Sequence, residues 1–184
     1  MRVIAGDAHG RRLVAPRGLS TRPATARVRA SIFSRLGSRL DLEGTRVLDI
    51  FAGSGSLGLE ALSRGSAAAV FVDSSRTAAV AIARNLRELD LVGRARILQG
   101  DFRHALAELG AGGESFEIVF VDAPYKNDLS SDVLALLIES NLIALDGYVV
   151  VRQFHRAPPP LAAGLESDSE AILGDHRIAL YRRR

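Results

Sequence analysis

The sequence predicts an α/β protein in which helices cover both faces of a mostly parallel β-sheet. From residue 45 onwards, short β-prone runs alternate with helical patterns along the chain. Several of these β-prone runs are apolar on both faces, as a parallel sheet between two helical layers requires. Strands that alternate with helices form βαβ units with right-handed crossovers. We therefore predict a Rossmann-like fold with three layers, α/β/α.

The predicted elements follow one another closely in the chain. The expected parallel strands are 46–51, 68–73, 94–98, 116–122 and 147–152. The expected helices fill the gaps at about 56–64, 75–89, 102–110 and 130–140. Two further β-prone runs, 165–170 and 176–181, have no helix between them. They indicate a C-terminal antiparallel hairpin added to the parallel sheet.

The first forty residues precede this alternation and are expected to form a small extension. The β-prone runs 2–5 and 11–14, separated by the sequence GDAHG, indicate a β-hairpin. A helix is predicted over 25–40 from its single apolar face, with Thr25 as the N-cap because its hydroxyl can accept an amide hydrogen. We therefore divide the chain into a 1–40 extension and a 41–184 domain.

The composition excludes several classes of protein. No run of about eighteen apolar residues is present, so no transmembrane helix is predicted. The N-terminal residues lack the apolar core of a signal peptide. The absence of cysteine excludes disulfides and thiolate metal sites, and the 4 histidines show no ligand spacing. We expect a monomeric cytoplasmic enzyme that holds no metal.

The basic residues are concentrated at the N-terminus. Residues 1–40 contain 9 arginines against the single acidic residue Asp7, a net charge of +8. Since the whole chain carries +3, residues 41–184 carry −5. A basic arm on a slightly acidic body indicates contact with a polyanion such as a nucleic acid.

A glycine-rich loop carries Gly53, Gly55 and Gly58 between a predicted strand and a predicted helix. Glycines let the backbone turn tightly and approach a ligand, and the following helix directs its amides into the same space. The pattern GxGxxG in this context fits a dinucleotide or S-adenosylmethionine (SAM). Asp73 ends the next strand, where it could bind ribose hydroxyls of either ligand.

The string Asp49-Ile-Phe51-Ala52-Gly53 favours SAM, because DxFxGxGxxG resembles the cofactor loop of class I SAM-dependent methyltransferases. The resemblance implies that Asp49 lies near the methionine end of SAM. It also implies that Asp101 and Phe102, after the third strand, contact the adenine. The residues that we expect to bind SAM are Asp49, Phe51, Ala52, Gly53, Gly55, Gly58, Asp73, Ser74, Gly100, Asp101 and Phe102.

The fourth strand ends in Asp122-Ala123-Pro124-Tyr125, which resembles the [D/N]-P-P-[Y/F/W] motif of methyltransferases that act on conjugated amines. The lone pair of such an amine is delocalised into the ring, so the nitrogen is a poor nucleophile. A carboxylate and a carbonyl that accept its hydrogens would make it more reactive. Asp122 would supply the carboxylate, Ala123 the carbonyl and Tyr125 a stacking ring, while Pro124 would hold Ala123 extended. Ala123 replaces the first proline of the motif.

Over essentially the whole chain, the sequence resembles the RsmD-type bacterial methyltransferases. The resemblance rests on RVIAGDAHGRRLVAP, TRPATARVRASIFSRL, FAGSGSLGLEALSRGS, ARNL and the D-x-P-Y loop. It implies methylation of guanine N2 in small-subunit (16S) ribosomal RNA, either free or in a 30S-type particle, with guanine 966 as the family's target. The residues that it implies for RNA contact are Arg11, Arg12, Arg22, Thr25, Arg27 and Arg29.

Several alternatives remain open at the level of the sequence. The methylated amine could belong to DNA adenine, protein glutamine or a small molecule, and the chain could instead be a non-catalytic RNA-binding protein that retains SAM structurally. The D-x-P-Y motif also occurs in enzymes that methylate the N6 amine of adenine in DNA, and the glycine loop also fits an NAD-type oxidoreductase. The oxidoreductase would leave the Asp122–Tyr125 motif without a role. The basic arm favours RNA as the substrate.

Overall fold

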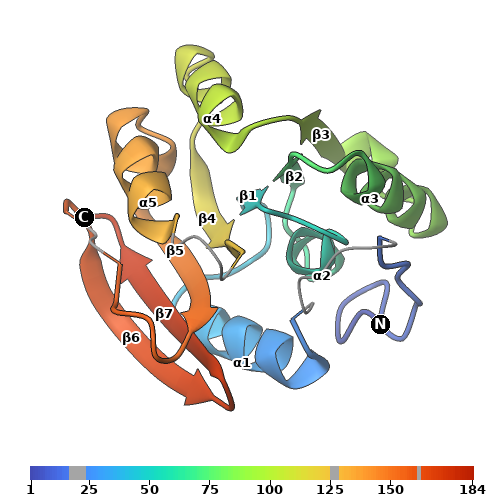
Figure 1. Ribbon diagram of the computed structural model, residues 1–184. Helices are drawn as coiled ribbons and strands as arrows, with labels where there is room; N and C mark the ends of the chain where they lie inside the picture. The colour runs from blue at the N-terminus through green and yellow to red at the C-terminus, as the bar shows by residue number, and fades with distance from the viewer. Residues whose placement is uncertain (17–23, 125–128, 161–162) are drawn as a thin grey trace.

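The computed structural model describes residues 1–16, 24–124, 129–160 and 163–184, and within these ranges the chain forms one seven-stranded sheet (Figure 1). The strands are β1 (Arg46–Ile50), β2 (Ala68–Asp73), β3 (Ala95–Gln99), β4 (Phe116–Val121), β5 (Ile143–Phe154), β6 (Glu166–Leu173) and β7 (His176–Arg182). Their order across the sheet is β3-β2-β1-β4-β5-β7-β6. Strands β1 to β5 pair in parallel, whereas β7 is antiparallel to β5 and β6. The predicted parallel sheet and C-terminal hairpin are confirmed.

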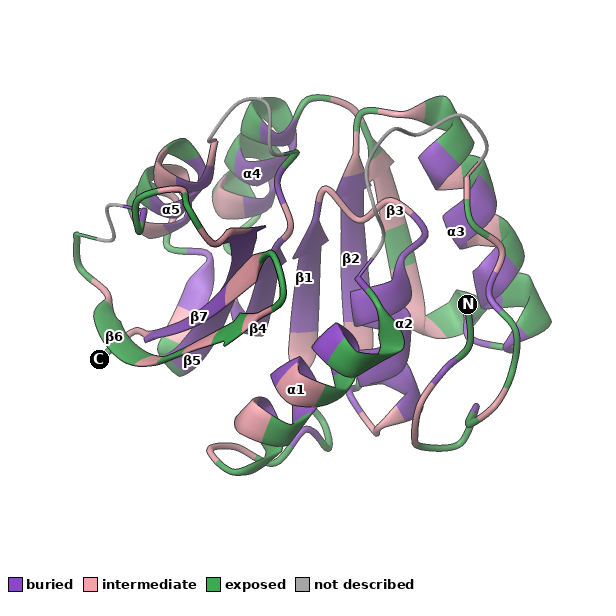
Figure 2. Cartoon of the chain, turned by 60° about the horizontal axis from the view of Figure 1, so that its bottom comes forward, coloured by how far each residue is buried: buried purple, intermediate pink, exposed green. Residues whose placement is uncertain are grey.

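Helices form a layer on each face of the sheet. They are α1 (Ala26–Gly37), α2 (Ser56–Ser63), α3 (Arg76–Glu88), α4 (Phe102–Ala111) and α5 (Ser130–Glu139), with a 3-10 turn η1 at Val92–Arg94. Successive strand residues point to opposite faces, so Ile118 and Phe120 of β4 pack with α1 and α2, while Val119 and Val121 pack with α4 and α5. Figure 2 shows these buried strands between the helical layers. The three-layer prediction is confirmed.

The N-terminal segment is less regular than predicted. Runs 2–5 and 11–14 do approach each other, but they form only one isolated antiparallel bridge, between Arg2 and Arg12. The amides of Ile4 and Ala5 donate instead to the carboxylate of Glu60 on α2, at 2.8 and 3.0 Å. The predicted hairpin is therefore present but short: backbone hydrogen bonds join Val3 to Arg11 and Leu13 to Met1, and a side chain replaces the partner strand for the Ile4 and Ala5 amides.

The extension shares its core with the rest of the chain. Val3 and Leu13 of the N-terminal segment, and Ile32 and Phe33 of α1, belong to the same buried cluster as residues of the sheet. The predicted boundary at residue 40 is therefore not a division of the hydrophobic core. α1 ends at Gly37, three residues before the predicted end. Its predicted N-cap is confirmed, because the Thr25 hydroxyl accepts from the Val28 amide at 3.3 Å.

Among the described residues, no helix is both long and apolar enough to span a bilayer.

Candidate functional site

Three carboxylates meet at one edge of the sheet. Asp49 lies in β1, Asp73 ends β2 and Asp122 follows β4, and the parallel pairing of these strands brings their carboxyl ends together. Asp49 is fully buried, and burial raises the pKa of its carboxyl well above the usual value. The Gly58 amide opposes this rise in pKa, whereas the charges of Asp122 and Asp73 add to it. The prediction that these residues lie at the same edge of the sheet agrees with this arrangement.

Two of these carboxylates hold the glycine loop in place. Asp73 accepts from the Gly53 amide and from the Ser75 amide, both at 2.8 Å. Asp49 accepts from the Gly58 amide at 2.9 Å, one turn into α2. Each carboxylate therefore binds backbone on one side of the loop. The loop is shaped by the same acidic residues that the sequence assigns to ligand binding.

The three glycines of the loop differ in their surroundings. Gly53 has φ +57, and a Cβ built there would meet no atom closer than the Phe51 carbonyl at 3.9 Å. By contrast, a Cβ at Gly58 would lie 2.4 Å from Cε1 of Phe71 in β2. Gly53 therefore leaves room for a ligand, whereas Gly58 allows α2 to pack closely on the sheet. Gly55, with φ +74, is the N-cap of α2.

The remaining predicted cofactor residues line the same edge. Asp101 caps α4 by accepting from the Arg103 amide at 2.8 Å, and its exposed carboxylate also lies 3.8 Å from the Arg103 guanidinium. Phe102 is buried with its ring centroid 5.3 Å from that of Phe51. The Gly100 amide donates to the Asp73 carbonyl at 3.0 Å. Ser74 is exposed and Ala52 is half-buried beside them.

The carboxylate of Asp122 is held by an arginine that the sequence analysis did not identify. Arg152 in β5 donates from Nε to Oδ1 and from Nη2 to Oδ2, both at 2.7 Å. This bidentate contact fixes the plane of the carboxylate, because the guanidinium is itself planar. Arg152 is buried, and Asp122 is half-buried at the edge of the sheet.

The other members of the D-x-P-Y motif differ in exposure. Ala123 is buried and Pro124 is exposed, directly after β4. The Asp122 amide donates to the Ile50 carbonyl at 3.4 Å, which ties the start of the motif to the end of β1. Tyr125 lies outside the described residues. The motif thus begins beside the acidic strand ends and next to the glycine loop.

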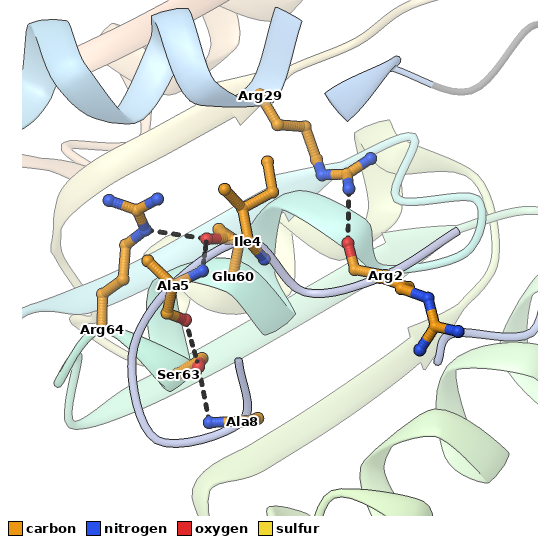
Figure 3. Close-up of polar contacts among 8 residues, drawn as sticks. All are labelled: Arg2, Ile4, Ala5, Ala8, Arg29, Glu60, Ser63 and Arg64. Carbon is orange, nitrogen blue, oxygen red and sulfur yellow. Dashed lines mark hydrogen bonds and ion pairs between the residues drawn. The ribbon is translucent and has the colours of Figure 1, made fainter. Parts of the chain in front are cut away.

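The N-terminal segment is anchored on α2 by two buried polar side chains (Figure 3). Glu60 is 1% exposed and accepts from Ile4, Ala5 and the Arg64 guanidinium, the last at 2.9 Å. Ser63 accepts from the Ala8 amide at 3.0 Å and donates to the Ala5 carbonyl at 2.6 Å. These contacts fix the backbone of the arm along α2.

Arg29 does not have the role that the sequence predicts for it. It is 1% exposed, and it donates to the carbonyls of Ala24 and Arg2 at 2.7 and 2.6 Å (Figure 3). Burial lowers the pKa of Arg29, and the nearby Glu60 carboxylate opposes that shift. The expectation that Arg29 contacts RNA is therefore wrong, because its guanidinium joins α1 to the N-terminal segment inside the protein.

The other described residues expected to contact RNA lie on the surface. Arg11, Arg12, Thr25 and Arg27 are exposed, and Arg22 lies outside the described residues. The Arg11 guanidinium donates to the Glu88 carbonyl at the end of α3. A groove of about 880 Å³ lies between the N-terminal residues 1–15 of the arm and the start of α1. Its lining includes Arg2, Arg12 and Thr25, and none of its described lining residues is acidic.

The chain is similar to proteins of known family. A family model described as "Conserved hypothetical protein 95" matches residues 1–182. The Bacillus subtilis protein YlbH is 37% identical over 185 residues, covering all of both chains. The Ribosomal RNA small subunit methyltransferase D of Escherichia coli (strain K12) is 33% identical, covering 100% of this chain and 90% of that one. The solved structure of Escherichia coli yhhF matches with a TM-score of 0.86 at 33% identity, covering 100% of this chain and 98% of that one.

Proposed function

The chain belongs to the family described as conserved hypothetical protein 95, the RsmD-type methyltransferases, and from that premise we propose its reaction and substrate. It transfers a methyl group from SAM to the exocyclic N2 amine of a guanine in small-subunit ribosomal RNA. The modified guanine is the family's target, guanine 966. The substrate is either the free small-subunit ribosomal RNA or a 30S-type particle. The enzyme acts as a monomer in the cytoplasm.

The observation that carries this proposal is the fixed carboxylate of Asp122 beside the glycine loop. Both of its oxygens are paired with Arg152 at 2.7 Å. Each carboxylate oxygen has two lone pairs, so Asp122 can still accept a hydrogen from a substrate amine. A carboxylate whose plane is held by a buried guanidinium presents those remaining lone pairs in fixed directions within that plane.

The residues of the sheet edge fit SAM as the cofactor. The open face of Gly53 leaves space beside the loop. Asp73 and Asp101 are hydrogen-bond acceptors at successive strand ends, suited to ribose hydroxyls and to the adenine amine. The buried Asp49 and the rings of Phe51 and Phe102 complete the set. Bound SAM would supply an electrophilic methyl group whose carbon–sulfur bond breaks as the amine nitrogen attacks.

The protein's own part in the reaction is to hold and polarise the amine. Asp122 and the Ala123 carbonyl would accept its two hydrogens, which draws the nitrogen lone pair out of the ring. Pro124 restricts Ala123 to an extended backbone and so directs that carbonyl. Tyr125 would stack on the guanine. The proton that the amine loses after transfer can pass to water, so no strong base is required.

The basic arm supplies the contact with RNA. Arg12 is exposed and lines the groove, Arg11 is exposed beside it in the sequence, and Arg27 is exposed on α1. We assign Arg11, Arg12, Arg22, Thr25 and Arg27 to the RNA-binding surface of the 1–40 extension. Arginine suits this task because its planar group makes paired hydrogen bonds to phosphate oxygens.

The test is labelled methyl transfer onto small-subunit ribosomal RNA from cells that lack the gene, with the product nucleoside identified by mass spectrometry. The wild-type protein should produce N2-methylguanine. Asp122→Asn should lower the transfer rate by about 100-fold or more while S-adenosylhomocysteine binds within about threefold of wild type. Asp132→Asn serves as the matched control, because this exposed carboxylate pairs only with a surface arginine among the described contacts.

Three outcomes would contradict the proposal. Methylation of DNA adenine without RNA methylation would assign the protein to a different substrate. Tight binding of NAD with no binding of SAM would assign it to a different reaction. Loss of S-adenosylhomocysteine binding in Asp122→Asn would place Asp122 in the cofactor site instead of the amine site.

A further inference from the structure

One buried side chain of α3 contacts both the glycine loop and the basic arm. Asn85 has no solvent exposure. Its Oδ1 accepts from the Val14 amide at 2.7 Å, and its Nδ2 donates to the Val14 carbonyl at 2.9 Å. The same Nδ2 donates to the Ser54 carbonyl at 3.0 Å. A single amide group therefore joins a residue of the arm to a residue of the loop.

The chemistry of the three contacts fixes the orientation of this amide. The Val14 amide needs an acceptor, whereas the carbonyls of Val14 and Ser54 need donors. A flipped Asn85 would set an NH2 group against the Val14 amide and an oxygen against both carbonyls. All three contacts are therefore made together or lost together. An apolar side chain of the same size would leave the buried Ser54 carbonyl and both backbone groups of the half-buried Val14 without these partners.

The two backbone segments belong to different parts of the proposed site. Ser54 lies between Gly53 and Gly55, in the loop assigned to SAM. Val14 follows Arg11 and Arg12, which are assigned to RNA. The loop is thus held from one side by Asp73, at the Gly53 amide, and from the other by Asn85, at the Ser54 carbonyl.

The arm also follows α3 beyond Asn85. Arg11 donates to the Glu88 carbonyl, three residues further along the chain from Asn85. Leu13 is buried in the same cluster as Leu86 and Leu89 of this region. A shift of the arm relative to α3 would therefore disturb the Asn85 contacts, and a shift of the loop would disturb the same side chain from its other end.

We propose that Asn85 is a positioning residue that couples SAM binding at the glycine loop to RNA binding by the arm. This inference rests on the proposed function, which assigns those two segments to the two ligands. A ligand that stabilises the observed position of Ser54 also favours the observed position of Val14, and the effect is reciprocal because binding free energies are linked. The Asn85 amide carries the coupling together with a weaker direct contact, in which the Ser54 hydroxyl lies 3.7 Å from the Met1 sulfur.

The coupling can be measured directly with two probes. The affinity for S-adenosylhomocysteine is measured with and without saturating small-subunit ribosomal RNA, and the RNA affinity is measured with and without S-adenosylhomocysteine. In the wild type, each probe should tighten the binding of the other by the same factor, about fivefold or more. Asn85→Leu should lower that factor to half of its wild-type value or less, with the Ser54–Met1 contact carrying what remains. Asn85→Asp keeps the acceptor for the Val14 amide but loses both donors, so it should also lower the factor.

Thr45→Val provides the matched control. The Thr45 hydroxyl is buried and donates to the Leu42 carbonyl at 2.8 Å, just before β1 and at the opposite edge of the sheet from the loop. This variant loses that hydrogen bond and also the buried contact with the Ser66 hydroxyl at 2.8 Å, and neither contact involves the arm or the loop. It should keep the wild-type coupling factor. Loss of coupling in Thr45→Val as well would show that general destabilisation, and not Asn85, is the cause.

A measurement on the wild type keeps the proposal testable if the Asn85 variants do not fold. Binding of S-adenosylhomocysteine should slow hydrogen exchange at the Val14 amide, which donates to Asn85 and lies outside the glycine loop. Unchanged exchange at Val14, a wild-type coupling factor of one, or full coupling in Asn85→Leu would each overturn the inference. Failure of the proposed function is distinguishable, because the wild type would then not bind one of the two probes at all.

Discussion

Replacing Glu60 by Gln should lower the free energy of unfolding by about 3–5 kcal/mol and loosen the first residues of the arm. The buried carboxylate accepts three hydrogen bonds, from the amides of Ile4 and Ala5 and from the Arg64 guanidinium. A glutamine has only one acceptor oxygen, so its NH2 group must face at least one of these donors. In the better orientation, the Ile4 amide is left without an acceptor.

The magnitude follows from those contacts. Leaving the half-buried Ile4 amide without an acceptor costs about 1–3 kcal/mol. The two remaining hydrogen bonds lose a charged acceptor, which weakens each by about 1 kcal/mol. The total is about 3–5 kcal/mol, which agrees with the usual cost of removing one partner from a buried charged pair. The lost attraction between Glu60 and the buried Arg29 acts in the same direction.

Urea unfolding at fixed pH measures the stability, and hydrogen exchange at Ile4 and Ala5 measures the local effect. Glu88→Gln is the control, since Glu88 is exposed and lies 3.9 Å from the Arg84 guanidinium. That variant should change the free energy of unfolding by less than about 0.5 kcal/mol. The reasoning is refuted if Glu60→Gln matches the control, or if exchange at Ile4 and Ala5 is unchanged.

Three other variants test separate parts of the site. Arg152→Met should lower the rate of methyl transfer by about 100-fold. Arg152→Lys should recover little of this rate, because an ammonium cannot hold both oxygens of Asp122. A wild-type single-turnover rate in the Met variant would contradict this. The folded-state pKa of Asp49 is raised, so wild-type stability should fall as pH rises from the unfolded pKa of about 3.9 towards the folded one. Asp49→Asn cannot titrate at this position, so its free energy of unfolding should rise relative to that of the wild type over the same pH range. An identical pH dependence of the free energy of unfolding in the two proteins, measured by urea unfolding, would contradict this. Gly58→Ala should cost about 1–3 kcal/mol in thermal unfolding because its Cβ would overlap the Phe71 ring, and a variant as stable as wild type would show that α2 can move away from β2.

The sheet was predictable because its signals are local. Each strand of the parallel sheet reads as a short apolar run, and each helix as a pattern with a period of about 3.6 residues. The short length of the N-terminal hairpin was not predictable in the same way. Its amides at Ile4 and Ala5 find their acceptor on Glu60, 56 and 55 residues away in the sequence. No local pattern records that partner.

The site was partly predictable for a topological reason. Parallel strands place their carboxyl ends at one edge, so Asp49, Asp73 and Asp122 could be assigned to one site before their contacts were known. Arg152 could not, because its contact depends on the pairing of β4 with β5. One signal was available: a single charged residue within the apolar run GYVVVRQF, where a buried charge needs a partner.

Arg29 carried a similar signal. Ile32, Phe33 and Leu36 lie three, four and seven residues after it, which places Arg29 on the apolar face of α1. Its position in an arginine-rich segment conceals this, because net charge along the sequence does not show which face of a helix a side chain occupies. Arg29 thus belongs to the interior, and the exposed surface carries one cation fewer than the sequence suggests.

These internal contacts bear on how the arm can bind RNA. Residues 1–14 are held by Glu60 and Ser63 on α2, by Asn85 on α3 and by Arg29 on α1. Most of the backbone entropy of residues 1–14 is therefore lost when the protein folds, before any ligand binds. A preorganised cationic surface loses less free energy to ordering than a disordered basic tail of the same charge. If the arm binds RNA as proposed, the buried polar side chains of α1, α2 and α3 should therefore affect RNA affinity without touching RNA, and the same contacts connect residues 1–14 to the loop proposed to hold SAM.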